Sequence, residues 1–151
     1  MLRRDFLRTG VLFAGGAGAV GGAMRAMARD SSADALSQAF PGLIHSARFP
    51  GEWKGKERGH IPVVTLHGLY ATVETRHGMS PRHYIVRHTI LRPETGTVIA
   101  AHTYDPEMDT QARSTFLLPP QCCSETLVAT SFCNRHDLWV SAFVVPEASG
   151  D

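Results

Sequence analysis

Seven short segments rich in β-branched and aromatic residues follow one another from residue 61 onward, and they constrain the fold more than any other feature of the chain. Turn-forming residues such as Pro93-Glu94-Thr95-Gly96 and Asp105-Pro106 separate them. No segment sustains a helical apolar period over three turns. The pattern predicts an all-β fold, a seven-stranded immunoglobulin-like antiparallel β-sandwich. The expected strands are Ile61 to Leu66, Leu69 to Thr75, Tyr84 to Leu91, Thr97 to Tyr104, Ser114 to Leu118, Thr126 to Phe132 and Leu138 to Val145.

Metal-ligating side chains stand in two of the expected turns. His77 and His83 lie six positions apart in one turn, and Cys133 and His136 form a Cys-x-x-His pair in another. A tight turn at either spacing can direct both of its side chains at one ion, and His60 stands alone before the first expected strand. Four imidazoles and one thiol make a mixed nitrogen and sulfur set suited to iron, copper or zinc.

Three further histidines and two further cysteines are interpreted as structural. His67, His88 and His102 stand alone, without a second ligand at metal-binding spacing, and Cys122 and Cys123 are adjacent in a proline-rich turn. The two cysteines are read as buried or loop thiols, and a vicinal disulfide is the alternative. Three cysteines are an odd number, so at least one is expected to be free or bound to metal, and Cys133 is the candidate.

The N-terminus has the features of a twin-arginine export signal. Arg3-Arg4-Asp5-Phe6-Leu7-Arg8 precedes the apolar, Gly/Ala-rich stretch from Val11 to Ala23, and Ala26-Met27-Ala28 follows as a small-residue cleavage site. A membrane anchor is less favoured because the apolar run is shorter than the roughly 20 residues that span a bilayer. We expect a periplasmic or otherwise exported protein with no membrane segment after cleavage. Twin-arginine export carries folded proteins, commonly with a metal or cofactor already inserted, which favours a metalloprotein.

Removal of residues 1–28 changes the charge balance. The signal holds four basic residues and one acidic residue of the chain's 15 and 14, so 11 bases and 13 acids remain and the formal charge is −2. This balance gives no argument for nucleic acid as a partner. The remaining length suffices for one domain. Residues 29–50, rich in Ser and Ala, are expected to form a tether or a loosely packed arm, and residues 51–147 the single domain.

Three motifs from Trp53 to Val145 resemble those of the superoxide reductases, particularly neelaredoxin and the iron-binding domain of desulfoferrodoxin. His60-Ile61-Pro62-Val63-Val64 is similar to the family's Lys-His-Val-Pro-Val-Ile segment. His77-x-Met79-x-Pro81-x-His83-Tyr84-Ile85 is similar to its His-Pro-Met-x-x-x-His-Tyr-Ile loop, and Phe132-Cys133-Asn134-x-His136-x-Leu138-Trp139 to its Tyr-Cys-Asn-x-His-Gly-x-Trp ending. The three motifs occur in the family's order.

The resemblance implies one non-haem iron, cycling between Fe(II) and Fe(III), with four equatorial imidazoles and an axial thiolate. Carried over by position, the equatorial ligands are His60, His77, His83 and His136, and the axial ligand is Cys133. The implied activity is the one-electron reduction of superoxide to hydrogen peroxide at the open sixth position. The resemblance leaves the electron donor unidentified and a homo-oligomer open.

One departure from the family concerns the charged residues before His60. The family usually places a lysine there, often after a glutamate, to attract superoxide and help deliver a proton, but this chain has Gly59. Lys56, Glu57 and Arg58 precede it, and a one-residue shift would let Arg58 replace the cation. Arginine is a poor proton donor, because a guanidinium keeps its proton. Two lesser departures replace the family's Pro with Gly78 and its Gly with Asp137.

Two other functions remain as alternatives. A copper electron-transfer protein on a similar sandwich would also use two histidines and a cysteine, but no methionine follows His136 to serve as the axial ligand. A relative that keeps the metal site but acts as an iron electron-transfer or metal-carrier protein, without reductase activity, is favoured by the missing lysine. Metal analysis and a superoxide assay distinguish these alternatives.

Overall fold

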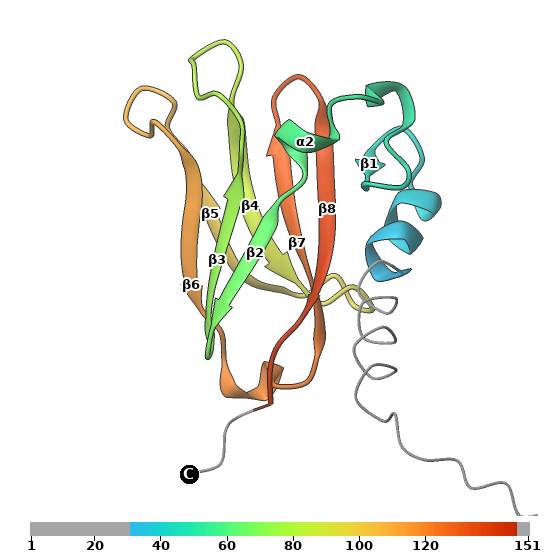
Figure 1. Ribbon diagram of the computed structural model, residues 1–151, viewed down its shortest axis with the longest axis vertical. Coiled ribbons are helices and arrows are strands. Elements are labelled where there is room, and N and C mark those ends of the chain that lie inside the picture. The colour runs from blue at the N-terminus through green and yellow to red at the C-terminus, as the bar shows by residue number, and fades with distance from the viewer. Residues whose placement is uncertain (1–30, 148–151) are drawn as a thin grey trace, which may run out of the picture.

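The computed structural model describes residues 31–147, so the predicted export signal, residues 1–28, lies outside the described part. Within residues 31–147, eight strands form two sheets that face each other (Figure 1). One sheet, in the order β1-β8-β7-β4-β5, consists of β1 (Ile44–His45), β8 (Asp137–Val144), β7 (Thr126–Cys133), β4 (Ile85–Leu91) and β5 (Val98–Thr103). The other, in the order β2-β3-β6, consists of β2 (Val63–His67), β3 (Tyr70–Thr75) and β6 (Ala112–Leu117).

The helices are short. One covers residues 31–39. The α2 helix (Glu57–His60) leads into β2, and two 3₁₀ turns, η1 (Gly51–Trp53) and η2 (Pro120–Cys122), connect other elements. Among the helices within residues 31–147, none is long and apolar enough to cross a membrane.

The predicted all-β class and the two-sheet arrangement are confirmed, and β2 to β8 correspond to the seven predicted strands. The predicted count is wrong by one, because β1 also joins the larger sheet. It pairs in parallel with β8, so the described sheets are not wholly antiparallel. A two-residue strand carries no alternation of apolar and polar residues, which explains why the sequence pattern does not reveal it. The immunoglobulin-like type stays a prediction.

Residues 31–50 pack more closely than the loosely packed arm expected from the sequence. The helix over residues 31–39 places Ala33 and Leu36 against Val128 and Val140, on the outer face of the larger sheet. The Ser46 hydroxyl donates to the buried Asp34 carboxylate at 2.7 Å. The described part of this helix, residues 31–39, makes fewer than three turns, so its apolar face is too brief to give a clear helical period there.

The main apolar core lies between the two sheets. Ala71 and Val73 of β3 pack against Ile90, Leu127 and Ala129 of the larger sheet in the main apolar cluster. Full burial of a valine, leucine or isoleucine side chain contributes about 1.5–3 kcal/mol.

A smaller cluster packs above the main one, formed by Ile85, Tyr104, Ala112 and Cys133. It supports the end of the sandwich where α2 and the β3–β4 and β7–β8 connections gather (Figure 1).

Candidate metal centre

Five side chains that the sequence singles out come together at this end of the sandwich. The ligating atoms of His60, His77, His83, Cys133 and His136 all lie within 4.8 Å of one another. We call these five residues the ligand cluster. His60 and Cys133 are buried, and the other three members are partly exposed. The cluster is therefore buried on the side of His60 and Cys133 and reaches solvent at its other three members.

Strand ends explain why residues far apart in sequence meet here. His77 follows β3 and His83 precedes β4, and a tight turn closed by two hydrogen bonds between the Ser80 and His83 backbones joins them. Cys133 is the last residue of β7 and pairs with Ile85 of β4. His136 lies in the turn between β7 and β8, and His60 ends α2.

The four imidazoles form a ring of neighbours. Successive pairs, from His60 to His77, His83, His136 and back to His60, have ring centroids 4.4–4.8 Å apart and interplanar angles of 71–88°. His60 and His83 are 6.3 Å apart and tilted by only 30°, so they lie across the ring from each other.

The inward nitrogens have the spacing of ligands set at right angles. His60 Nε2 and His136 Nδ1 are 3.0 Å apart, and His83 Nε2 is 3.1 Å from both His136 Nδ1 and His77 Nε2. Ligands about 2.1 Å from a shared centre and at right angles lie about 3.0 Å from each other. A square of nitrogens around one ion fits these distances.

The Cys133 sulfur lies over this square. Its Sγ is 3.6 Å from His136 Nδ1 and 3.9 Å from His77 Nε2, and these two histidines are opposite members of the ring. Burial raises the pKa of the Cys133 thiol, and the backbone N–H groups of Arg135 and His136 oppose this by donating to the sulfur. These two donors would stabilise a thiolate once a cation is present.

Hydrogen bonds from the outer ring nitrogens set which nitrogen faces inward. His60 Nδ1 is 2.8 Å from the Lys56 carbonyl oxygen, and His77 Nδ1 bonds to the Gly78 carbonyl oxygen. A carbonyl only accepts, so each Nδ1 carries the proton and each Nε2 is left with a free lone pair. His136 differs, because its Nδ1 faces inward.

The imidazoles are held neutral. Burial, followed by the nearby imidazoles of the cluster, lowers the pKa of His60 to about 4 against the opposing effect of the Lys56 hydrogen bond. Burial is also the largest cause of the lowered pKa values of His77, His83 and His136. Neutral imidazoles can ligate a metal at neutral pH without first losing a proton.

This donor set fits iron better than the alternatives. Structural zinc takes four tetrahedral donors, and blue copper takes two histidines with a cysteine. The cluster offers five donors, four nitrogens in a square and one sulfur over it, which is more than either of these sites uses. His60, His77, His83, His136 and Cys133 could hold one six-coordinate ion and leave one coordination position free for a small ligand.

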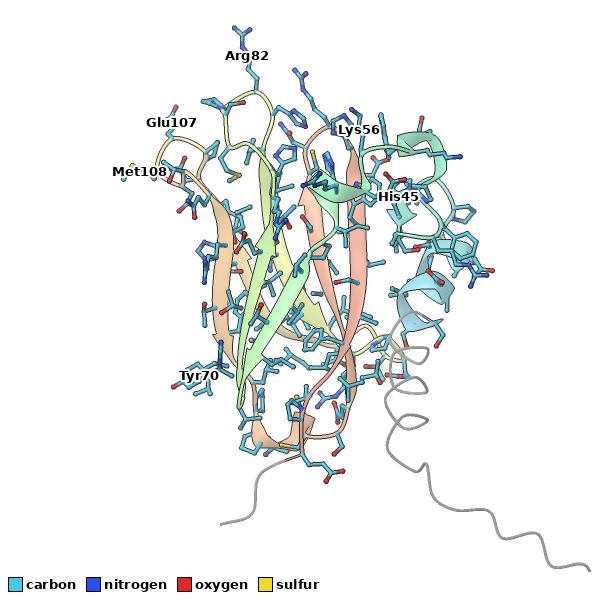
Figure 2. All side chains as sticks on the ribbon, viewed as in Figure 1. His45, Lys56, Tyr70, Arg82, Glu107 and Met108 are labelled. Carbon is cyan, nitrogen blue, oxygen red and sulfur yellow. The ribbon has the colours of Figure 1, made fainter. Side chains whose placement is uncertain are left out.

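The charged residues before His60 occupy different surroundings. The Glu57 carboxylate accepts the Gly55 N–H at 2.8 Å, which is the largest cause of its lowered pKa. Burial is the largest cause of the lowered pKa values of His83 and His136, and the charge of Lys56 adds to it. Lys56 lies at the cluster's end of the sandwich, where Arg82 points away into solvent (Figure 2). Arg58 is exposed on α2.

The remaining histidines and cysteines lie outside the ligand cluster. His67 and His102 are exposed on strands, and His88 is fully buried between the sheets. Cys122 is a free thiol in the main apolar cluster, at the far end of the sandwich, and Cys123 is a half-buried free thiol. These thiols agree with the structural reading and not with a vicinal disulfide.

Three residues around the cluster have no role predicted from the sequence: Trp53, Trp139 and Asp137. The Trp53 ring meets His136 edge-on at 4.7 Å, and the Trp139 ring lies 5.5 Å from His60. Trp139 Nε1 donates to the His136 carbonyl at 2.7 Å, and Trp53 Nε1 donates to the Asp137 carboxylate at the same distance. Their positions beside motif residues are the available signal, but a hydrogen bond across 84 positions has no sequence pattern.

The fold and the ligand cluster together define a β-sandwich protein with a candidate mononuclear metal centre of histidine and cysteine ligands. Residues 52–142 match the sequence profile of desulfoferrodoxin. The chain belongs to the desulfoferrodoxin family, because this match covers more than half of it. Among the curated proteins compared with the chain, none matches it.

Solved superoxide reductases share the fold. A variant of the superoxide reductase (neelaredoxin) from Ignicoccus hospitalis has a TM-score of 0.58 and 22% identity, covering 72% of this chain and 98% of its own. Another structure of that protein gives 0.56 and 20% with the same coverage. The superoxide reductase (1Fe-SOR) from Giardia intestinalis gives 0.50 and 18%, covering 58% of this chain and 98% of its own.

Proposed function

We propose that the protein is a superoxide reductase with one non-haem iron held by His60, His77, His83, His136 and Cys133. The observation that carries the proposal is the square of imidazole nitrogens with the Cys133 sulfur over it, in a chain of the desulfoferrodoxin family. When bound, the iron would supply one electron to superoxide. Two protons taken up from the surroundings complete hydrogen peroxide.

The chain's own residues hold and orient the donor atoms. The carbonyl groups of Lys56 and Gly78 fix the His60 and His77 rings, and the Arg135 and His136 N–H groups hold the negative charge on sulfur. Electron density from a thiolate favours release of the reduced product from the open side. The partial exposure of the His77, His83 and His136 side chains gives a small anion access.

Proton delivery does not rest on Glu57. The Gly55 N–H lowers the pKa of this carboxyl, so it is ionised at neutral pH and has no proton to give. Lys56 carries an ammonium with three N–H groups at the same end of the molecule. Lys56 Nζ and water are the groups that would pass protons to the reduced product.

A superoxide assay with metal analysis tests the proposal. Protein purified from its native compartment is expected to contain one iron per chain and, with a reductant present, to form one peroxide for each superoxide consumed. One peroxide for every two superoxides indicates dismutation instead. Stoichiometric copper or zinc without iron would refute the iron assignment. Iron without superoxide consumption would leave the electron-transfer or metal-carrier function.

The charges beside the cluster allow a test of substrate steering. Lys56→Ala is expected to slow the bimolecular reaction with superoxide a few-fold and to flatten its dependence on ionic strength, because steering is a screened Coulomb effect. Iron content should stay unchanged. Arg58→Ala, two positions further along in α2, is the matched variant, and we expect the smaller effect from it. A larger effect from Arg58→Ala would assign the steering to Arg58, the residue favoured by the sequence.

We also propose that residues 1–28 export the folded protein. Replacing Arg3 and Arg4 with Lys is expected to leave the precursor in the cytoplasm, because the translocase reads the arginine pair. Fractionation followed by immunodetection measures this, and replacing Arg25, outside the pair, is the control. Normal export of the double-lysine chain would indicate another route.

A further inference from the structure

A segment that precedes the family match reaches the metal centre. The desulfoferrodoxin profile begins at residue 52, whereas β1 (Ile44–His45) lies before it. β1 runs parallel to β8, with His45 opposite Trp139 in the register. Figure 1 shows β1 beside the β8 edge of the larger sheet, and Figure 2 labels His45 there. This contact adds residues to the surroundings of the cluster that the family profile does not cover.

The His45 side chain is held on several sides. It is 1% exposed, its ring lies 5.2 Å from that of Trp139, and its Nε2 is 3.2 Å from Asp137 Oδ2. A carboxylate only accepts, so His45 Nε2 carries the proton and donates it. A Cβ added at Gly51 would lie 3.2 Å from His45 Nδ1, so the backbone closes on the ring from another side. The imidazole is built into the fold with one N–H directed at Asp137.

Asp137 needs this support because of its backbone. It follows His136 directly and has a φ of 63°, in the left-handed region that favours glycine. The superoxide reductase motif resembled by this sequence has glycine at this position. The same oxygen, Asp137 Oδ2, accepts both the Trp53 Nε1–H at 2.7 Å and the His45 Nε2–H at 3.2 Å. These two hydrogen bonds offset the cost of the unusual conformation.

The network ends on a metal ligand. Trp53, which donates to Asp137, also packs edge-on against the His136 ring at 4.7 Å. His45 and Trp53 both donate to the Asp137 carboxylate and so hold the turn that carries His136. Trp53 also holds the His136 ring. Outer-shell groups of this kind orient metal ligands and tune the metal that they hold.

We propose that His45 is a positioning residue of the metal centre, which acts through Asp137 and Trp53 to fix the turn and the ring of His136. The segment that precedes the family match, which contains β1, then contributes to the metal centre. This inference rests on the metal site of the proposed function but not on superoxide as the substrate.

The charge of Asp137 gives the network a second effect. Asp137 follows the ligand His136 directly in the chain, and its carboxylate accepts from the Trp53 ring that packs against His136. A negative charge at this position favours the more positive state of a bound iron. Release of the carboxylate into solvent should therefore raise the reduction potential.

Metal titration of the full chain tests the role of His45. His45→Leu is expected to weaken Fe(II) or Co(II) binding by roughly tenfold and to raise the reduction potential of the iron form. His45→Gln should recover most of the affinity, because a glutamine amide carries an N–H donor at similar reach. His67→Leu, a change at an exposed histidine of β2, is the matched control and should leave both readouts unchanged.

A double-mutant cycle distinguishes positioning from packing. If His45 acts through Asp137, His45→Leu should have no further effect on affinity in an Asp137→Gly background. A loss of equal size in both backgrounds, or an affinity unchanged by His45→Leu in the wild type, overturns the proposal. Should His45→Leu fail to fold, His45→Gln is compared with His45→Asn, whose shorter amide should lose the affinity; equal affinities would overturn it.

The same titration separates the two proposals. A chain that binds iron with these dependences on His45 but leaves superoxide unreduced refutes the proposed function and supports the positioning role. If the chain reduces superoxide but His45→Leu changes neither its iron affinity nor its reduction potential, the proposed function is supported and the positioning role is refuted.

Discussion

Cys133→Ser is expected to abolish the thiolate-to-iron charge-transfer absorption of the oxidised, iron-loaded protein. Among the described cysteines, Cys133 is the one whose Sγ lies beside cluster nitrogens, at 3.6 Å from His136 and 3.9 Å from His77. A serine hydroxyl is a far weaker donor and gives no sulfur-based transition. Visible absorption of the oxidised protein, with iron content measured on the same sample, tests this expectation.

Cys123→Ser is the matched control. Cys123 is a half-buried free thiol next to η2, at the opposite end of the sandwich, so its replacement should leave the band intact. His67→Ala, at an exposed strand position, should do the same. A band that persists in Cys133→Ser, or that vanishes in Cys123→Ser, contradicts the assignment of Cys133 as the sulfur ligand.

The candidate ligands could be found from sequence because they sit in motifs at the ends of strands. Strand ends at one edge of a sandwich converge, so a turn such as 77–83 and a Cys-x-x-His turn meet once the strands are paired. The structure brings all five of the side chains together. The predicted strands are also those that carry dense β-branched and aromatic residues, and β7, buried on both faces, is the clearest case.

The N-terminal contribution could not be predicted in the same way. β1 has two residues, and His45 meets Asp137 across 92 positions, a distance at which no periodicity operates. In the sequence, Asp137 stands out only as a departure from the glycine of the similar family motif. The structural role of Asp137 depends on its positive φ and on two hydrogen-bond donors, Trp53 and His45, that lie far from it in sequence.

The assignment of the steering cation depended on the local shape of residues 56–60. The sequence interpretation places Lys56, Glu57 and Arg58 in a loop, in which a shift of one residue brings Arg58 to the lysine position. The structure forms a short helix instead, Glu57–His60, with Lys56 as its N-cap residue. The Lys56 carbonyl therefore meets the His60 ring, and the charge of Lys56 acts on the cluster histidines.

His88 illustrates a polar residue at a position where the strand pattern predicts an apolar one. It is fully buried between the sheets, and burial, followed by the charge of His102, lowers its pKa to about 4. Its Nε2 lies 2.9 Å from the Thr75 hydroxyl, and its Nδ1 accepts from the Tyr104 hydroxyl at 2.9 Å. Thr75 donates in turn to Ser131 at 2.9 Å, so the chain of hydrogen bonds ties the two sheets together below the cluster.

Acid is therefore expected to destabilise the protein through His88. Unfolded His88 binds a proton below its ordinary pKa of 6.5, whereas the folded group does so only near pH 4. The unfolded state binds more protons in this window, so the free energy of unfolding falls as the pH drops. His88 alone should account for a loss of about 3 kcal/mol by pH 4. Above pH 6.5 both states are neutral and the group has no pH effect.

Comparison of the wild type with His88→Gln isolates this contribution. Denaturant unfolding of the metal-free chain between pH 7 and 4 measures the free energy of unfolding of each protein, and the ligand histidines and carboxylates titrate equally in both. The difference between the two curves should shrink by about 3 kcal/mol over this window, because only the wild type loses stability through His88. His67→Gln, at an exposed position, should run parallel to the wild type. Parallel curves for His88→Gln would mean that His88 titrates alike in the folded and unfolded states, and that the hydrogen-bond chain from Tyr104 to Ser131 does not hold it neutral.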